Sequence, residues 1–319
     1  LGQIQSLVTN QNNHGFMKHL FIITILAFSM VACGGKNNAS DSNNDTNRNN
    51  AGNSKISKKQ RQLNISILLD LSDRISPKIN ANAQKNDIEN IKTITEFFKS
   101  NMTSLGAYNA KGKIRIFFSP PPVSSDINSM VSKLIIDCSK MDNKGRKGVY
   151  DNITKLYSQN LEKIYRQTIA TSAWEGSDIW RFFKNDVKDF CIQKDPNYRN
   201  ILIIFTDGYL YHSQSVINDK NRFSYLTNTN LKQYRKQDWK QMIERNDFGI
   251  KTERNDLNNL EVLVLEIKAE NPNNKVDEDI MSYLWKKWFK EMSVSNYEVY
   301  SSDLPANTKT RIENFLNHN

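Results

Sequence analysis

The chain contains four short runs of apolar, mostly β-branched residues, and these runs restrict its fold more than any other feature. They lie at Ile65–Leu71, Lys113–Phe118, Ile201–Phe205 and Leu260–Ile267. Nearly continuous apolar runs of this length are typical of strands that are buried on both faces. We therefore expect a sheet that is covered by helices on its two sides.

Between these runs, apolar residues recur at helical spacing. Strands that alternate with helices predict an α/β fold, here a doubly wound, mostly parallel sheet flanked by helices. We expect one domain over residues 61–319, closed by a weaker strand at Tyr297–Tyr300 and a helix at Thr308–Leu316. The other helices are expected at Ala83–Lys99, Tyr150–Ile169, Asp178–Cys191, Leu231–Arg245 and Asp277–Met292.

Residues 17–33 have the pattern of a signal peptide. A charged start at 17–19 precedes the apolar run Leu20–Ala32, which is shorter than the ~20 residues that a spanning helix needs. The end of this run, followed by Cys33, resembles a bacterial lipobox, which predicts a lipidated Cys33 as the mature amino terminus. The alternative is a cleavable secretory signal in which Cys33 is incidental. Residues 1–16 are expected to be an upstream extension.

Residues 34–60 are expected to be a disordered polar tether. The segment is rich in Asn, Ser, Asp and Lys and holds almost no apolar residue, so it cannot bury enough surface to offset the entropy of ordering. Acyl chains on Cys33 would hold the protein at the membrane, and such a tether would let the folded domain stand off the membrane surface. The predicted location is the cell envelope, facing the periplasm or exposed on the surface.

Composition argues against a nucleic acid as the partner. The formal net charge is +10, but Lys and Arg are scattered through the chain with no run dense enough to follow a phosphate backbone. The densest basic segment, Leu231–Arg245, is expected to be a helix with a solvated basic face and with Tyr234 and Trp239 partly inward.

Hydroxyl and carboxylate side chains follow the expected strands where ligands gather in α/β sheets, outside the carboxyl ends of the strands. The run Ile65–Leu71 leads into Asp70-Leu71-Ser72-Asp73-Arg74, and Ile201–Phe205 leads into Thr206-Asp207-Gly208. A third loop, Gly176-Ser177-Asp178, opens the helical segment between them.

In these three loops the sequence resembles the von Willebrand factor A (VWA) family. Its metal-ion-dependent adhesion site uses a D-x-S-x-S loop after the first strand, a hydroxyl from a second loop, and an Asp in a D-G turn after the fourth strand. Asp70 and Ser72 match the first loop, Ser177 the second, and Asp207 with Gly208 the third. The resemblance implies an adhesion or protein-interaction domain in which these residues hold Mg²⁺, and a carboxylate of a protein partner completes the coordination.

Arg74 departs from this pattern, because it stands where the family has its second serine. A guanidinium offers no oxygen to a metal and adds a positive charge. Two alternatives follow. Asp73 supplies the missing oxygen, or Arg74 itself neutralises Asp70 and Asp207 in place of the metal.

Two other functions remain as alternatives to this binding function. A metal-dependent phosphoryl hydrolase would use Asp70 and Asp207, but its usual D-x-D pair is broken by Ser72. A metal-free scaffold subunit of a membrane-associated complex is the other, and Arg74 favours it. We therefore expect a binding protein and not an enzyme.

Two further sets of residues bear on these hypotheses. Cys138 and Cys191 either form a disulfide in an oxidising envelope or remain as two free thiols. Aromatic side chains in or near the loops suit a protein interface, although the helical spacing of one of them, Trp180, fits core packing equally well. These aromatic residues are Trp174, Trp180, Tyr209 and Tyr211.

Overall fold

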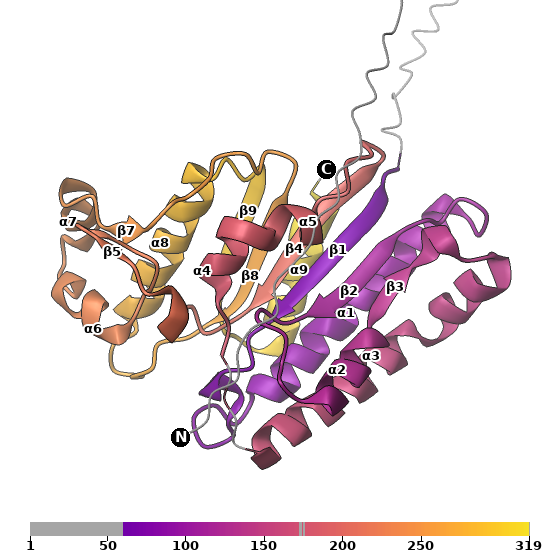
Figure 1. The fold of residues 1–319 in the computed structure, drawn as a ribbon, viewed down its shortest axis with the longest axis horizontal. Coiled ribbons are helices and arrows are strands. Elements are labelled where there is room, and N and C mark those ends of the chain that lie inside the picture. Colours follow the sequence, from indigo (N-terminus) through magenta and orange to yellow (C-terminus); the bar gives the residue numbers. More distant parts are fainter. Residues whose placement is uncertain (1–59, 172–173, 175, 319) are drawn as a thin grey trace, which may run out of the picture. The chain divides into compact units, whose positions relative to one another are not determined.

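The computed structural model describes residues 60–171, 174 and 176–318, and these residues build an α/β domain around a six-stranded sheet (Figure 1). The strand order is β3-β2-β1-β4-β8-β9; β3 runs antiparallel to β2, and all other neighbours are parallel. The strands are β1 (Gln62–Leu69), β2 (Lys113–Phe117), β3 (Ile135–Asp137), β4 (Tyr198–Phe205), β8 (Glu261–Ile267) and β9 (Asn296–Ser301).

Helices flank the sheet. The longest are α1 (Ala83–Leu105), α3 (Asn143–Thr171), α8 (Val276–Glu291) and α9 (Pro305–Asn317). Shorter helical segments are α2 (Ser125–Ser132), α4 (Ile179–Arg181), a π-helical turn at Phe182–Asp186, and α5 (Val187–Cys191). The prediction of a mostly parallel sheet flanked by helices is confirmed. The expectations for residues 1–33, Cys33 among them, and for residues 34–59 lie outside the described residues.

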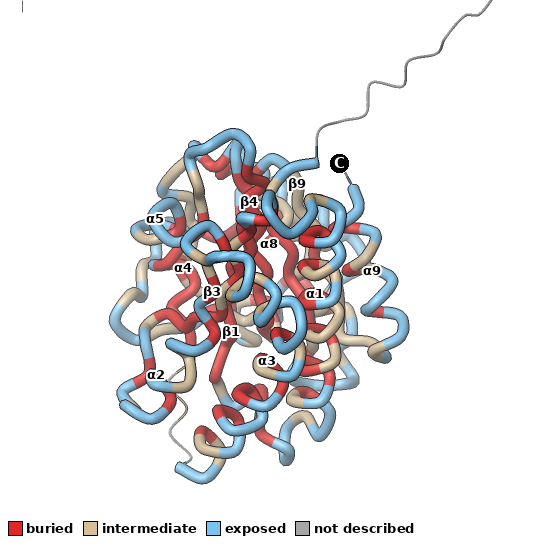
Figure 2. The backbone as a smooth tube through the Cα atoms, turned by 90° about the vertical axis from the view of Figure 1, so that its right-hand side faces the viewer, coloured by how far each residue is buried: buried red, intermediate tan, exposed pale blue. Residues whose placement is uncertain are grey.

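The central strands are buried on both faces, as their continuous apolar runs predicted. Every residue of β4 is buried, and Figure 2 shows buried residues along the strands and on the inward sides of the helices. Alternate residues of β1 enter two separate hydrophobic clusters: Ile65 and Ile67 pack with α1, α3 and α9, whereas Leu68 packs with the α4–α5 segment and α8. The sheet is therefore the shared wall of two cores.

Between β4 and β8 the structure differs from the prediction. The expected helix Leu231–Arg245 is interrupted: α6 (Asn228–Leu231) is followed by a 3₁₀ turn at Lys232–Tyr234, and α7 begins only at Trp239 (Trp239–Arg245). At the interruption, the Arg235 guanidinium forms two 2.8 Å hydrogen bonds with the carboxylate of Asp277 on α8. Beside these helices lies a small sheet of two-residue strands, too short to give a sequence pattern: β5 (Asn218–Asp219), β6 (Arg222–Phe223) and β7 (Gly249–Ile250).

The two described cysteines are free and buried. Cys138 belongs to the cluster around α1, and Cys191 belongs to the cluster around α8, so the sheet separates them. Burial raises the pKa of Cys138 to about 11 and that of Cys191 to about 12, which keeps both thiols protonated. Of the two alternatives, the free-thiol state is the one present. Within the described part of the chain, no helix has the length and apolar character needed to cross a membrane.

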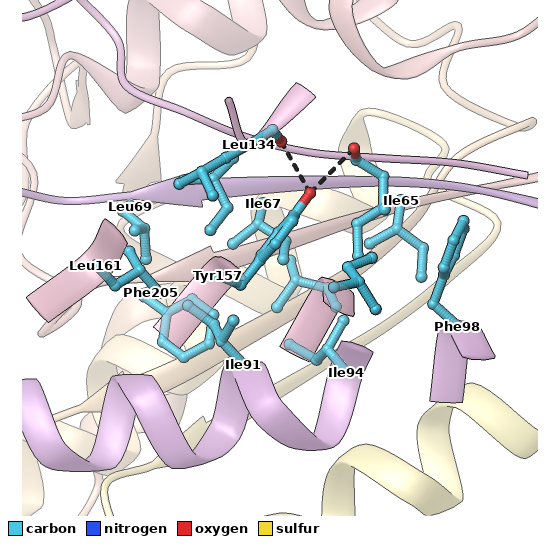
Figure 3. Packing of buried hydrophobic residues seen from close by; sticks show 14 of the residues in the cluster. Ile65, Ile67, Leu69, Ile91, Ile94, Phe98, Leu134, Tyr157, Leu161 and Phe205 are labelled. Atoms are coloured by element: carbon cyan, nitrogen blue, oxygen red, sulfur yellow. Dashed lines mark hydrogen bonds between the residues drawn. The ribbon is translucent and has the colours of Figure 1, made fainter. Parts of the chain in front are cut away.

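Tyr157 of α3 joins a helix to the edge of the sheet. Its side chain is fully buried, and its hydroxyl lies 3.1 Å from the main-chain oxygen of Ile114 and 2.8 Å from that of Leu134 (Figure 3). The ring packs among apolar residues of β1 and α1, which Figure 3 shows around it. A polar group inside this core is tolerated because its hydrogen-bonding capacity is used.

We expect Tyr157→Phe to lower the free energy of unfolding by about 1–3 kcal/mol, because main-chain oxygens in the core then lose a donor while packing is kept. Urea unfolding followed by circular dichroism measures the change. Tyr108→Phe is the matched control, since Tyr108 is 77% exposed. Equal stabilities of the two variants would contradict the role given to the Tyr157 hydroxyl.

Candidate functional site

The candidate site lies where the central strands β1 and β4 end. The two strands pair in parallel up to Leu69 and Phe205, and the Asp70 N–H continues the ladder by donating to the Phe205 oxygen at 3.0 Å. The next residues along each strand, Asp70 and Thr206, are therefore neighbours. This edge of the sheet brings together the two loops that the sequence marked as separate motifs.

Asp70 is the centre of the site and is almost completely buried. Its Oδ1 accepts the Ser72 N–H at 2.9 Å, and its Oδ2 lies 3.3 Å from the Thr206 hydroxyl. Burial raises the pKa of the Asp70 carboxyl, and this rise is opposed by the Arg74 charge and by hydrogen bonds from Ser72 and Ser177. Hydroxyl groups from three loops, those of Ser72, Ser177 and Thr206, therefore surround one buried carboxyl group.

The third predicted loop reaches the same place. The Ser177 hydroxyl lies 3.5 Å from the main-chain oxygen of Leu69, the last residue of β1. The loop is held by the Asp178 N–H, which donates to the Ser119 oxygen at 2.7 Å, and the Asp178 carboxylate caps α4 by accepting the Arg181 N–H at 3.1 Å. Asp178 is thus a positioning residue for Ser177.

Asp207 is partly exposed, and it is close enough to Asp70 for the charge of Asp70 to change its pKa. The pKa of the Asp207 carboxyl is raised to about 7, first by burial and then by the charge of Asp70, with Asp73 adding to the rise. The Arg74 charge and the Tyr209 N–H act in the opposite direction. The Tyr209 N–H lies 3.1 Å from Asp207 Oδ1. Asp73 itself is exposed in a 3₁₀ turn. The four predicted ligands Asp70, Ser72, Ser177 and Asp207 thus come together at one edge, with Asp73 near enough to act on Asp207.

Gly208 lets the chain turn directly after Asp207. Its φ is +97°, and a Cβ atom at this position would lie 2.6 Å from Cδ1 of Ile267. Its oxygen accepts the indole N–H of Trp285 at 2.9 Å. Glycine is therefore strongly favoured at position 208, because another residue would be strained at this φ and would displace the Ile267 side chain.

Arg74 lies beneath the first loop, with 4% of its surface exposed. Its guanidinium forms an ion pair with Asp87 of α1 at 2.8 Å, and the Tyr165 hydroxyl of α3 donates to the same Asp87 oxygen at 2.7 Å. Its Nε donates to the main-chain oxygen of Asp70 at 3.0 Å. Within the described residues no ion pair joins Arg74 to the carboxylates of Asp70 or Asp207, although its charge lowers the pKa of both. Arg74 therefore mainly links the first loop to helices α1 and α3.

Another buried carboxyl group, that of Glu266, lies close to the Arg74–Asp87 ion pair. Glu266 sits in a β-bulge near the end of β8 with a φ of +74°, and it is 4% exposed. It accepts hydrogen bonds from Asn86 and Asn90 of α1 at 3.3 and 3.0 Å and from the Ser302 hydroxyl at 2.6 Å. Burial and then the charge of Asp87 raise the pKa of Glu266. The site therefore rests on a polar layer inside the core.

Sequence reasoning missed this polar layer. One signal was available: Asp87 lies four and seven residues before Ile91 and Ile94 and so falls on the apolar stripe of α1, where an unpaired carboxylate would be costly. Such an aspartate predicts a buried cationic partner. Glu266 gave no comparable signal, because only the bulge turns it toward α1.

The aromatic residues near the loops have different environments. Trp180 is buried in the core and donates its indole N–H to the Lys251 oxygen at 2.8 Å, so core packing explains it. Tyr209 and Trp174 are half-buried, whereas Tyr211 is 61% exposed. Tyr211 is therefore the aromatic residue most open to a partner.

The donor set fits a hard divalent cation in chemical type. Carboxylate and hydroxyl oxygens are what Mg²⁺ prefers, and Mg²⁺ commonly keeps several waters between itself and the protein. The charge balance also fits, because the Asp70 charge acts on Asp207 while the Arg74 guanidinium is bound to Asp87. No cluster of three or more His, Cys, Asp or Glu side chains suited to a metal occurs in residues 60–171, 174 and 176–318. Any cation here therefore depends on hydroxyls and water as well as on the two aspartates.

Comparison with known proteins adds no family to this description. No protein-family model, no curated protein and no solved structure matches the chain. The functional argument therefore rests on the residues and their geometry.

We expect Asp207→Asn to stabilise the metal-free domain at pH 8 and to have little effect near pH 4. The folded-state pKa of Asp207 is raised to about 7 from 3.8. The folded protein consequently loses stability as the pH rises from about 4 to about 7, and the penalty is fully present above that range. Asparagine removes the penalty and keeps an oxygen for the Tyr209 N–H.

The expected gain at pH 8 is about 1–3 kcal/mol, measured by urea unfolding in the presence of a chelator. Asp189→Asn, on the exposed end of α5, is the control. A gain of the same size at both pH values would show that the carboxyl group of Asp207 is not the cause.

Proposed function

We propose that this chain is a lipid-anchored envelope protein whose VWA-like domain binds a protein partner through a divalent cation. Asp70, Ser72, Ser177 and Asp207 would hold Mg²⁺, and a carboxylate of the partner would complete its coordination. The bound cation supplies a positive centre with a position open to an anionic ligand. The pairing of β1 with β4, which places the first and last motifs at one edge, supports the doubly wound VWA-like arrangement.

One observation carries the proposal: two neighbouring carboxyl groups at the sheet edge lack a counter-charge of their own. The charge of Asp70 is among the causes that raise the pKa of Asp207 to about 7, while the Arg74 guanidinium is held by Asp87 and Tyr165. Burying like charges together is unfavourable unless a proton or a cation is taken up. A divalent cation would remove the repulsion and use the surrounding hydroxyls.

Binding is favoured over hydrolysis by the identity of residue 72. A phosphoryl hydrolase of the D-x-D type needs a second carboxyl group there to act as acid and base, and the hydroxyl of Ser72 cannot replace it. The metal-free scaffold remains the second candidate, because Arg74 already lowers the pKa of both Asp70 and Asp207. The next experiment separates these two candidates.

We expect Mg²⁺ to raise the melting temperature of the domain and a chelator to reverse the effect. A ligand that binds only the folded state stabilises it by about 2.7 kcal/mol at one hundred times its Kd. Asp207→Ala should abolish the response, whereas the control Asp189→Asn should keep it. A melting temperature that Mg²⁺, Ca²⁺ and Mn²⁺ all leave unchanged in the parent protein would reject the metal and leave the scaffold.

We expect Cys33→Ser to move the protein from the membrane fraction to the soluble fraction, because acyl chains on Cys33 would supply most of the attachment. Fractionation and metabolic labelling with a radioactive fatty acid measure the change. Ser42→Ala in the expected tether is the control. If Cys33→Ser still sediments with membranes and carries the label, the lipoprotein assignment is wrong.

A further inference from the structure

An open cavity of about 570 Å³ lies between α7 and α8, away from the candidate metal site. Two half-buried aromatic side chains form its corner: Trp239 at the start of α7 and Tyr283 on α8. Their ring centroids are 5.4 Å apart and their planes meet at 83°. The Tyr283 hydroxyl donates to Glu244, which fixes that ring. The corner therefore offers rigid apolar surface inside a polar cavity.

Five polar side chains around this corner have no side-chain partner among the described residues. In the part of the chain that the structure describes, no hydrogen bond or ion pair engages the carboxylates of Asp238 and Asp279, although Asp238 stands at the N-cap position of α7. The same holds for the side chains of Gln237, Gln241 and Ser282. Carboxylates, amides and a hydroxyl therefore offer both acceptors and donors beside the rings.

The position of Lys240 helps to define the ligand. Its ammonium group lies 5.2 Å from the centre of the Trp239 ring and so occupies the place where a ligand ammonium would make a cation–π contact. A cationic ligand on this ring would have to displace the Lys240 ammonium group, and an anionic one would meet the carboxylates of Asp238 and Asp279. A neutral ligand rich in hydroxyl groups avoids both problems, because each hydroxyl can donate to a carboxylate and accept from an amide or ammonium.

From this arrangement we infer that the cavity between α7 and α8 is a saccharide-binding site. The C–H face of a pyranose ring would pack on Trp239 and Tyr283, and its hydroxyls would bind Asp238, Asp279 and Gln241. The site is independent of the metal proposal, since it shares no residue with it. The sequence predicted that Leu231–Arg245 is one helix with a solvated basic face. The segment is instead interrupted after Tyr234, and Trp239 at the start of α7 lines the cavity.

Isothermal titration of the domain with cellotetraose, chitotetraose and maltotetraose tests the inference. We expect saturable binding of at least one of the three at one site per chain. Trp239→Ala should weaken it at least about tenfold, Trp239→Phe should restore part of the affinity, and Asp238→Asn with Asp279→Asn should weaken it about fivefold. The control Asp189→Asn should bind like the parent. Circular dichroism establishes that each variant is folded.

Chain length distinguishes the source of the sugar. A site for a polysaccharide gains affinity from mono- to tetrasaccharide, whereas a site for the terminal sugar of a glycan binds the methyl glycoside equally well, and either result supports a saccharide site. Failure of all three oligosaccharides to bind, or binding that Trp239→Ala and the double aspartate variant leave unchanged, would overturn the inference. So would tighter binding of tetramethylammonium at the same residues, which would identify a cation site.

Discussion

The parallel pairing of β1 with β4 is the constraint on which the rest of the domain depends. It runs in register over eight residues, from Gln62 opposite Tyr198 to Leu69 opposite Phe205, and nearly all of these residues are buried. Two parallel strands that end together must release their loops at the same edge. The hydrophobic core thereby determines where Asp70 and Asp207 meet, and a change that shifted the pairing would separate them.

Beneath that edge, one buried guanidinium, that of Arg74, lies among several carboxyl groups. The charge of Arg74 acts on four buried or partly buried carboxyl groups, those of Asp70, Asp87, Asp207 and Glu266. Asp87 forms the ion pair, and Glu266 accepts hydrogen bonds from two amides and a hydroxyl. Of the remaining two, Asp70 is buried and Asp207 is partly exposed, and neither has an ion-pair partner among the described residues.

How far the sequence predicts this molecule depends on how many residues share a pattern. The sequence predicted the strands buried on both faces, the long helices and the three loops near the strand ends. Each of these features shows a pattern of residue types over several neighbouring positions. The small sheet was not, since two residues such as Arg222 and Phe223 carry no periodicity. Arg74 was recognised as unusual, but its partner Asp87 comes from a helix, and only the packing of α1 against β1 brings the two together.

The bulge at Glu266 has a consequence for how β8 tolerates change. Before it, Val264 faces the core around α8 and Leu265 the core around α1. After it, Ile267 faces α8 again, although it lies two positions after Leu265 and would share its face in a regular strand. The extra residue resets the parity of the strand, so that Glu266 reaches α1 and Ile267 reaches Gly208. A substitution in β8 changes one side chain, whereas the loss or gain of one residue before the bulge would change the face of every residue up to it. The number of residues in this strand is therefore a requirement of the fold beside their apolar character.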